Sequence, residues 1–353
     1  MTIRRALTLT AATIAGAMML SGCLAGENAP STPTAEAAAG TATAAAADGW
    51  SADRLTLDFA TYNPLSLIIK EQGWLEAELG GEVTVEWVQS AGSNKANEAL
   101  RAGAIDVGST AGSAPLLARA NGSPIRTIDI YTQPEWAAIV VPAGSPITSV
   151  ADLAGKRVAA TKGTDPYFFL LQALDEAGVA LDSVTVENLQ HADGKSALEA
   201  GSVDAWAGLD PLMAASQATA GSTLLYRNVA FNSYGFLNAT EQFLSRSPDL
   251  AQLVVDAYER ARAWAIENPE ETAAILAEVA AIDPAVATTV ITERTTFDLD
   301  PAPGDAQRAV LAIVGPIFVE SGDVANQDLI DAALDTLFDD GFAIQADPSR
   351  FDG

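Results

Sequence analysis

The 353-residue sequence contains one cysteine, Cys23, and one histidine, His191. A disulfide needs two cysteines, and structural zinc sites need clusters of Cys and His, so the sequence excludes both. Basic residues are also scarce: 19 Lys and Arg stand against 46 Asp and Glu, for a formal net charge of −27 at pH 7. Phosphate backbones repel so acidic a chain, which excludes nucleic acid as a partner. We expect no metal and no cofactor.

Catalytic patterns are missing as well. No Gly-x-Ser-x-Gly motif occurs, and no Walker loop follows the Gly-rich segments. His191 has no second histidine beside which it could act, and we interpret it as a solvated loop residue. The sequence therefore predicts a binding protein rather than an enzyme.

The N-terminus has the pattern of a bacterial export signal. Arg4 and Arg5 precede an apolar stretch over residues 6–20, and residues 20–23 (LSGC) match a lipobox. The stretch is too short to span a membrane. We expect residues 1–22 to be removed and Cys23 to carry the lipid anchor on the outer face of the cell membrane. The Ala-, Thr-, Gly-, Ser- and Pro-containing residues 23–52 are predicted to form a flexible tether.

The remaining residues, 53–353, are long enough for two domains. Predicted strands alternate with helices from residue 55 to about 226, and the rest is helical almost to the end. This order predicts an α/β fold with two lobes and a helical C-terminal region. Lobe 1 is expected to hold residues 53–136 and 239–353, and lobe 2 residues 137–238. The predicted chain crossings, at 137–141 and 233–238, would form a hinge.

A short sequence repeat supports the prediction that the two lobes have similar α/β structures. Residues 99–106 (ALRAGAID) return as residues 197–204 (ALEAGSVD), with five of eight positions identical. Each copy reads as a helix end, a capping Gly and the start of a strand that leads into a loop of small residues. Ligands of open α/β sheets bind at such strand ends. The alternative is that the helix–Gly–strand connection is common and that the similarity of the two copies is due to chance.

Four strand-to-helix loops are candidates for holding a ligand: residues 62–64, 89–94, 109–113 and 161–165. Helix N-termini leave backbone N–H groups unpaired, and Gly, Ser and Thr let an anion approach them. The candidate ligand-binding residues are Tyr62, Asn63, Gly92, Ser93, Asn94, Thr110, Ala111, Gly112, Gly163, Thr164, Asp165 and Asp210. The same side chains would also cap helices without any ligand.

Two acids in these loops bear on the charge of the ligand. Asp165 and Asp210 would repel a sulfonate or phosphate but would pair with an amine. We therefore hypothesise a zwitterionic ligand, such as an amino-sulfonate. A helix cap at Asp165 and a turn at Asp210 are the alternatives.

Several segments resemble one known family: residues 62–64, 92–94, 99–110, 145–147, 151–159, 161–164, 203–206 and 210–211. Together with the signal and lipobox they are similar to the substrate-binding lipoproteins of ABC importers. The nearer branch is that for aliphatic sulfonates, taurine and nitrate, which shares its fold with binders of thiamine precursors. The segments around Asp165 and before Asp210 depart from this pattern, which leaves the exact ligand open.

The resemblance implies a type II periplasmic-binding-protein fold with a small sulfonate held between two lobes and passed to a membrane permease. It implies ligand contacts at Asn63, Ser93, Thr110, Ala111, Thr164 and Asp210. A binder of nitrate or of a thiamine-pyrimidine precursor, and a surface receptor without transport, are the alternatives. We expect a monomer.

Overall fold

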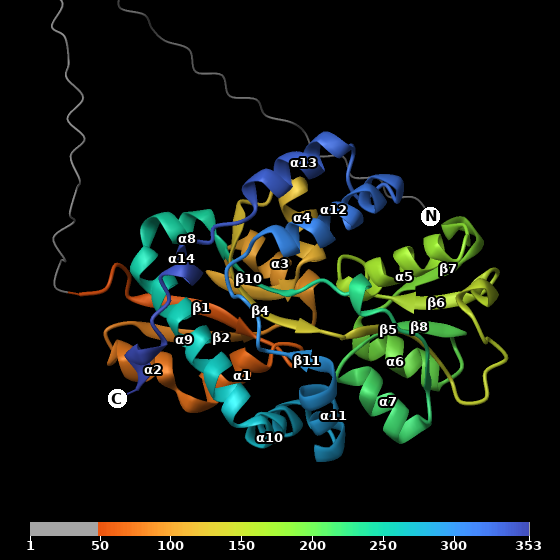
Figure 1. Cartoon of the computed structure of the whole chain (residues 1–353), viewed down its shortest axis with the longest axis horizontal. Coiled ribbons are helices and arrows are strands. Elements are labelled where there is room, and N and C mark those ends of the chain that lie inside the picture. The colour runs from red at the N-terminus through yellow and green to blue at the C-terminus, as the bar shows by residue number, and fades with distance from the viewer. Residues whose placement is uncertain (1–48, 353) are drawn as a thin grey trace, which may run out of the picture. The chain divides into compact units, whose positions relative to one another are not determined.

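The computed structural model describes residues 49–352, and the predicted signal peptide, Cys23 and most of the predicted tether lie outside them. One six-stranded sheet has the order β11-β4-β10-β3-β1-β2 (Figure 1). Its strands are β1 (Arg54–Phe59), β2 (Thr84–Gln89), β3 (Val107–Ala111), β4 (Ile125–Pro134), β10 (Gly235–Thr240) and β11 (Thr295–Thr296). Strand β1 pairs in parallel with β2 and β3, whereas β10 runs antiparallel between β3 and β4.

A second sheet of five strands has the order β7-β6-β8-β5-β9. Its strands are β5 (Ala137–Val141), β6 (Arg157–Ala160), β7 (Thr185–Asn188), β8 (Ala205–Leu209) and β9 (Thr223–Tyr226). Strand β6 is parallel to β7 and β8, and β5 is antiparallel to β8 and β9. Every residue of β5 and β8 is buried, as expected for central strands with both faces covered.

Helices cover both sheets. They are α1 (Pro64–Gln72), α2 (Trp74–Leu79), α3 (Ser93–Ala102), α4 (Ser113–Ala120), α5 (Asp165–Glu176), α6 (His191–Glu199), α7 (Leu212–Ala220), α8 (Glu241–Arg246), α9 (Pro248–Glu267), α10 (Pro269–Ala280), α11 (Pro284–Arg294), α12 (Asp305–Glu320), α13 (Gln327–Thr336) and α14 (Gly341–Ile344). Short 3₁₀ turns lie at Val150–Leu153, Leu181–Ser183, Val229–Phe231 and Pro348–Phe351. No helix of residues 49–352 combines the length and the apolar character that a membrane span requires.

The C-terminal helices bind the two halves together. Helix α9 packs against β4 of the six-stranded sheet, whereas α11 contacts α7 and α12 contacts α5 beside the five-stranded sheet (Figure 1). The helical C-terminal region therefore bridges both sheets rather than covering only the first.

The chain passes between the sheets at residues 135–136, after β4, and returns at residues 227–234, before β10. The segments expected to be crossings differ from this, because residues 137–141 are strand β5 and residues 235–238 lie inside β10. Both segments are buried, so pairing within a sheet satisfies their backbone groups better than an open connection would.

The expected tether ends earlier than residue 52. Trp50 and Ala52 are partly buried against the core, and the backbone N–H of Ser51 donates to Asp249 at the start of α9, at 2.9 Å. An indole ring buries much apolar area, so residues 50–52 belong to the folded body.

Gly235 opens β10 directly after the return crossing, and the structure leaves no room for a side chain there. A Cβ atom would lie 2.4 Å from the ring of the fully buried Tyr131 and 2.7 Å from Thr132 Oγ1. We expect Gly235→Ala to lower the free energy of unfolding by about 1–3 kcal/mol through overpacking. Gly341→Ala, where the nearest atom is 3.5 Å away, is the matched control and should change urea unfolding little. Equal unfolding midpoints for the two variants would contradict the prediction.

Candidate ligand-binding site

The structure brings predicted residues of both halves to one small cavity. Tyr62, Ser93 and Ala111 reach it from the side of the six-stranded sheet. Thr164, in the loop after β6 of the five-stranded sheet, and Asp165, the first residue of α5, reach it from the other side. Trp136, Pro166, His191 and Leu209 complete its wall. An adjoining cavity shares Tyr62 and Trp136 and is lined by Asp210, Thr132 and Arg294 among others.

Other predicted residues point elsewhere. The amide of Asn63 donates to Tyr258 Oη at 2.9 Å, and its side-chain oxygen caps α1. The hydroxyl of Thr110 accepts from Asn238 at 2.8 Å within the sheet. Asn94 and Gly163 line a separate hollow on the surface. The side chains of Asn63 and Thr110 thus serve their own half of the fold, as the capping alternative allowed, whereas Asn94 and Gly163 lie near each other across the two halves.

At Gly92 and Gly112, each next to the start of a helix, a neighbouring side chain lies too close to leave room for a Cβ atom. A Cβ at Gly112 would lie 2.7 Å from the Phe236 ring, and one at Gly92 would lie 2.9 Å from His191 Nε2. Their role in this structure is to let elements approach each other. Residues 109–111, expected in a loop, lie in strand β3.

Asp165 joins the two halves and both chain crossings. Its Oδ1 accepts from Ser113 Oγ at 2.5 Å and Ser233 Oγ at 2.7 Å, and its Oδ2 accepts from Trp136 Nε1 at 2.9 Å and Ser233 N at 2.8 Å. The carboxylate is 2 % exposed. Burial raises its pKa above the ordinary value, and these four hydrogen bonds oppose that rise.

Asp210, just after β8, pairs across the halves with Arg294 at the end of α11. Arg294 Nη1 donates to both carboxylate oxygens, at 2.9 and 3.1 Å, and Nη2 donates to Gln217 at 2.8 Å. Both side chains of the pair are less than 10 % exposed. Burial raises the pKa of Asp210 to about 6, although the guanidinium opposes the shift. Sequence reasoning missed Arg294, which lies 84 positions from its partner and in no motif.

His191 begins α6 and is 2 % exposed, so its interpretation as a solvated loop residue is wrong. Thr161 Oγ1 donates to Leu189 O at 2.6 Å, so it accepts the proton of His191 Nδ1 across 3.2 Å. This assigns the ring the Nδ1–H tautomer. Desolvation lowers the pKa of His191 to about 3. The pattern of a strand, a short loop and a helix start could have placed His191 with the other loops.

An aromatic pair lines both cavities. The rings of Tyr62 and Trp136 meet edge to face with centroids 6.2 Å apart. Tyr62 Oη donates to Ser109 O at 3.0 Å, and Trp136 donates to Asp165, so both rings are held in place. They form part of the apolar wall of both cavities.

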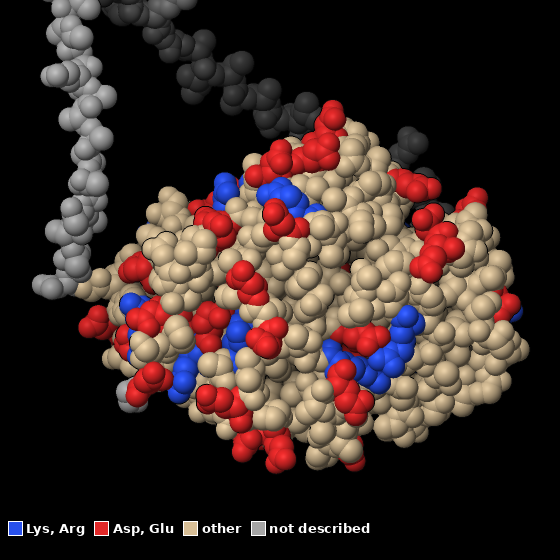
Figure 2. Space-filling model, viewed as in Figure 1, with Lys and Arg blue, Asp and Glu red and all other residues tan. Residues whose placement is uncertain are grey.

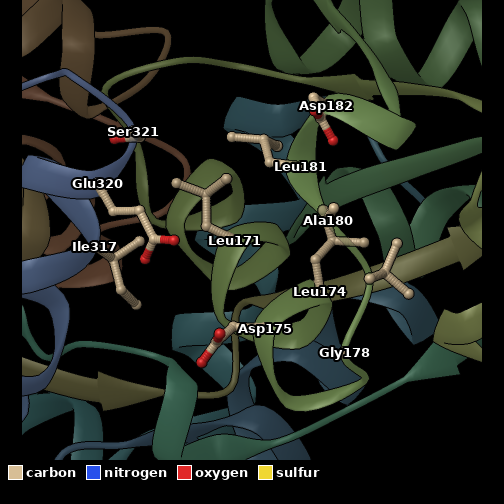
Figure 3. Close-up of a pocket in the computed structure, with 11 residues that line it drawn as sticks. Leu171, Leu174, Asp175, Gly178, Ala180, Leu181, Asp182, Ile317, Glu320 and Ser321 are labelled. Atoms are coloured by element: carbon tan, nitrogen blue, oxygen red, sulfur yellow. The ribbon is translucent and has the colours of Figure 1, made fainter.

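The two cavities each hold about 10 Å³ of free space, about that of one water molecule. Neither cavity has room for a small-molecule ligand in this structure. A larger groove of about 750 Å³ is lined by Leu171 and Leu174 of α5 and by Ile317 of α12 (Figure 3). It opens to the surface and is lined by none of the predicted site residues.

The visible surface carries scattered acidic side chains, and Lys and Arg occur in a few groups beside them (Figure 2). Two α/β halves, two crossings next to a small cavity lined from both halves, and a bridging C-terminal region define a solute-binding protein of the periplasmic-binding-protein fold. This confirms the predicted fold class.

Residues 66–272 match the family model described as "NMT1/THI5 like", and the chain belongs to that family. It is 30% identical over 222 residues to a putative aliphatic sulfonates-binding protein of Escherichia coli K12, covering 62% of this chain and 70% of the relative. The alkanesulfonate-binding protein SsuA from Xanthomonas axonopodis pv. citri, solved with MOPS bound, has a TM-score of 0.72 and 25% identity over 80% of this chain and 98% of that one.

The fold itself is shared more widely. The desulfurization enzyme DSZB has a TM-score of 0.61 and 18% identity, covering 83% of this chain and 98% of that chain. This likeness shows a common fold, and binding is distinguished from catalysis by the site alone.

Proposed function

We propose that this protein is the extracytoplasmic solute-binding component of an ABC importer and that it captures a small sulfonate between its two halves. The observation that carries the proposal is the enclosed cavity lined from both halves. Two relatives support the proposal. One is the putative aliphatic sulfonates-binding protein, with which this chain shares 30% sequence identity, and the other is the structurally similar alkanesulfonate-binding protein.

The chemistry of the walls fits this ligand class. A sulfonate needs several hydrogen-bond donors for its three oxygens, and its alkyl part needs an apolar surface. Arg294 supplies a guanidinium and Thr132 a hydroxyl, while Tyr62 and Trp136 supply the aromatic surface. Because the chain as a whole is strongly acidic, local donors of this kind must do the capture.

Capture follows from closure of the two lobes. We propose residues 53–136 and 239–353 as one lobe and 137–238 as the other, with the connections at 135–136 and 227–234 as hinge segments. Separation of the lobes would break the contacts of Asp165 and Asp210 and open the cavity. Closure around a ligand would restore them with the ligand inside.

We also propose the remaining properties predicted from the sequence. The mature protein would be a monomer anchored to the outer face of the cell membrane through lipidated Cys23, with a tether of about residues 23–49. Its protein partner would be a membrane permease. Binding without catalysis is favoured because residues 49–352 contain no cysteine and because their one histidine is held neutral.

The test is calorimetric titration and thermal unfolding of residues 23–353 with ethanesulfonate, nitrate and a hydroxymethylpyrimidine. We expect ethanesulfonate to bind with a micromolar Kd and to raise the Tm, because a ligand at 100 times Kd adds about 2.7 kcal/mol of stability. A response to nitrate or the pyrimidine alone would replace the sulfonate by that ligand. No response to any of the three would refute import of these solutes and favour a receptor role.

A further inference from the structure

The groove lined by α5 and α12 is separate from the candidate ligand-binding site. Leu171 and Leu174 of α5 and Ile317 of α12 contribute apolar side chains to its wall. The same two helices are joined by a core contact, because Phe168 and Phe318 are buried and their ring centroids lie 4.2 Å apart. Packing between the helices therefore holds the groove in shape without a partner.

Apolar side chains continue beyond the groove along the exposed face of α12. Ile313 lies four residues before Ile317, on the same face of the helix, and is 63 % exposed. Val179 and Leu181, in the segment that follows α5, also line the groove and are only partly buried. Exposed apolar patches with a polar rim are typical of surfaces that bind another protein. The groove therefore has the apolar surface that a protein partner requires.

The charges around the groove have one sign. Asp175 near the end of α5, Asp182 in the 3₁₀ turn after it, and Glu320 at the end of α12 line the groove and are exposed (Figure 3). No Lys or Arg occurs in residues 163–194 or 309–349. Within residues 49–352, none of these three carboxylates forms an ion pair. A complementary partner therefore brings Lys or Arg together with apolar side chains.

We propose that this groove is a docking surface for the membrane permease, which inserts apolar side chains from a segment that also carries Lys or Arg. The inference rests on the proposed function, which names a permease as the protein partner. A second copy of this chain fits less well, because 46 Asp and Glu against 19 Lys and Arg give it the same sign of charge. Helix α5 belongs to one proposed lobe and α12 to the other, so the docked segment contacts both.

Charge reversal tests the acidic rim. Asp182→Lys/Glu320→Lys is added with ethanesulfonate to proteoliposomes that contain the permease and ATPase of the importer, and ATP hydrolysis is measured against the concentration of the binding protein. We expect the concentration that gives half-maximal stimulation to rise at least tenfold, because the new cations repel the basic segment. The control Glu267→Lys/Glu278→Lys changes the net charge equally at two exposed helix ends outside the groove and should match the wild-type protein. Equal values for the two double variants would overturn the inference.

A second pair of variants tests the apolar surface. Ile313→Ser should raise the concentration for half-maximal stimulation at least threefold, because it removes an apolar side chain that docking would cover. Ile266→Ser on α9 is the matched control, since that side chain is 51 % exposed, and it should leave the value unchanged. Circular dichroism checks that each variant is folded. The same value for both isoleucine variants would exclude the face of α12 from the docking surface and contradict the inference.

Calorimetric titration of each protein with ethanesulfonate separates docking from solute capture. The groove variants should keep the wild-type Kd, because no candidate site residue lines the groove. Wild-type protein that binds ethanesulfonate without stimulating ATP hydrolysis would overturn the docking inference alone, whereas protein that binds no ethanesulfonate would refute sulfonate capture. A wild-type dimer in sedimentation that Ile313→Ser dissociates would assign the groove to a second copy and also overturn the inference.

Discussion

Replacing Arg294 by Met should lower the free energy of unfolding by about 3–5 kcal/mol, because it leaves the buried carboxylate of Asp210 without its charge partner. Asp210 is 3 % exposed, and its remaining hydrogen bond within residues 49–352 comes from Ala214 N at 3.0 Å. Met replaces the apolar stem of the lost side chain, so the expected loss reflects charge more than a cavity. Urea unfolding at pH 7.5 measures the effect.

A double-mutant cycle separates the pair from the rest of the structure. Asp210→Asn alone removes the charge but leaves Arg294 buried, and the double variant removes both charges. We expect the double variant to be more stable than the sum of the two single losses predicts, by at least 1.5 kcal/mol. Lys95→Met breaks the exposed pair with Glu98 and serves as the control, with an expected loss below about 1 kcal/mol. An Arg294→Met loss as small as that of the control would contradict the prediction.

The same variants should change the balance between open and closed forms. The Asp210–Arg294 pair links the end of β8 in one half to α11, which is part of the C-terminal region. Its loss removes a contact made in the closed arrangement. If the halves are hinged as proposed, small-angle scattering of Arg294→Met without ligand should give a larger radius of gyration than for the wild-type protein.

Elements whose ends are set by nearby residues, such as a helix between a Pro and a Gly, could be predicted from the sequence. Helix α1 spans residues 64–72, because Pro64 suits its first turn and Gly73, at φ 64°, ends it. The repeat also has a structural meaning. Asp106 accepts from Thr56 N at 3.0 Å, and Asp204 accepts from Arg157 N at 2.8 Å. Each aspartate thus fixes the start of the neighbouring parallel strand in its own half.

Features that depend on distant partners could not be predicted in this way. Ser109, Thr110 and Ala111 look like a loop of small residues, yet they form strand β3 because β10, more than 120 positions later, pairs with them. Arg294 and His191 belong to the site only because α11 and α6 are brought to the cavity by tertiary packing. The sequence therefore predicted several residues that line the candidate cavity, whereas the arrangement of charges around that cavity emerged only from the folded chain.

Asp58 should make the free energy of unfolding fall as pH rises, and Asp58→Asn should remove this dependence. It lies in β1, is 1 % exposed, and accepts from Ser109 N at 2.8 Å and Ser109 Oγ at 3.0 Å. Burial raises its pKa to about 7 from an ordinary value of 3.8. The folded state therefore holds this proton more tightly than the unfolded chain does. The stabilisation from the protonated form is fully present below pH 3.8 and is lost as pH rises to about 7.

Asp58→Asn carries no charge at any pH, so the stability of the variant relative to the wild-type protein should increase by about 3 kcal/mol between pH 4.5 and 8, since each pKa unit is worth about 1.4 kcal/mol. His191, whose pKa is lowered, contributes in the opposite direction, and Asp165 and Asp210 contribute in the same direction as Asp58. All three are present in both proteins and cancel in the difference. Urea unfolding of the two proteins at pH 4.5, 6 and 8 gives that difference directly. A difference that stays constant with pH would mean that Asp58 is already ionised in the folded protein, and that a full negative charge lies beneath the strand that carries Ser109 and Ala111 to the site.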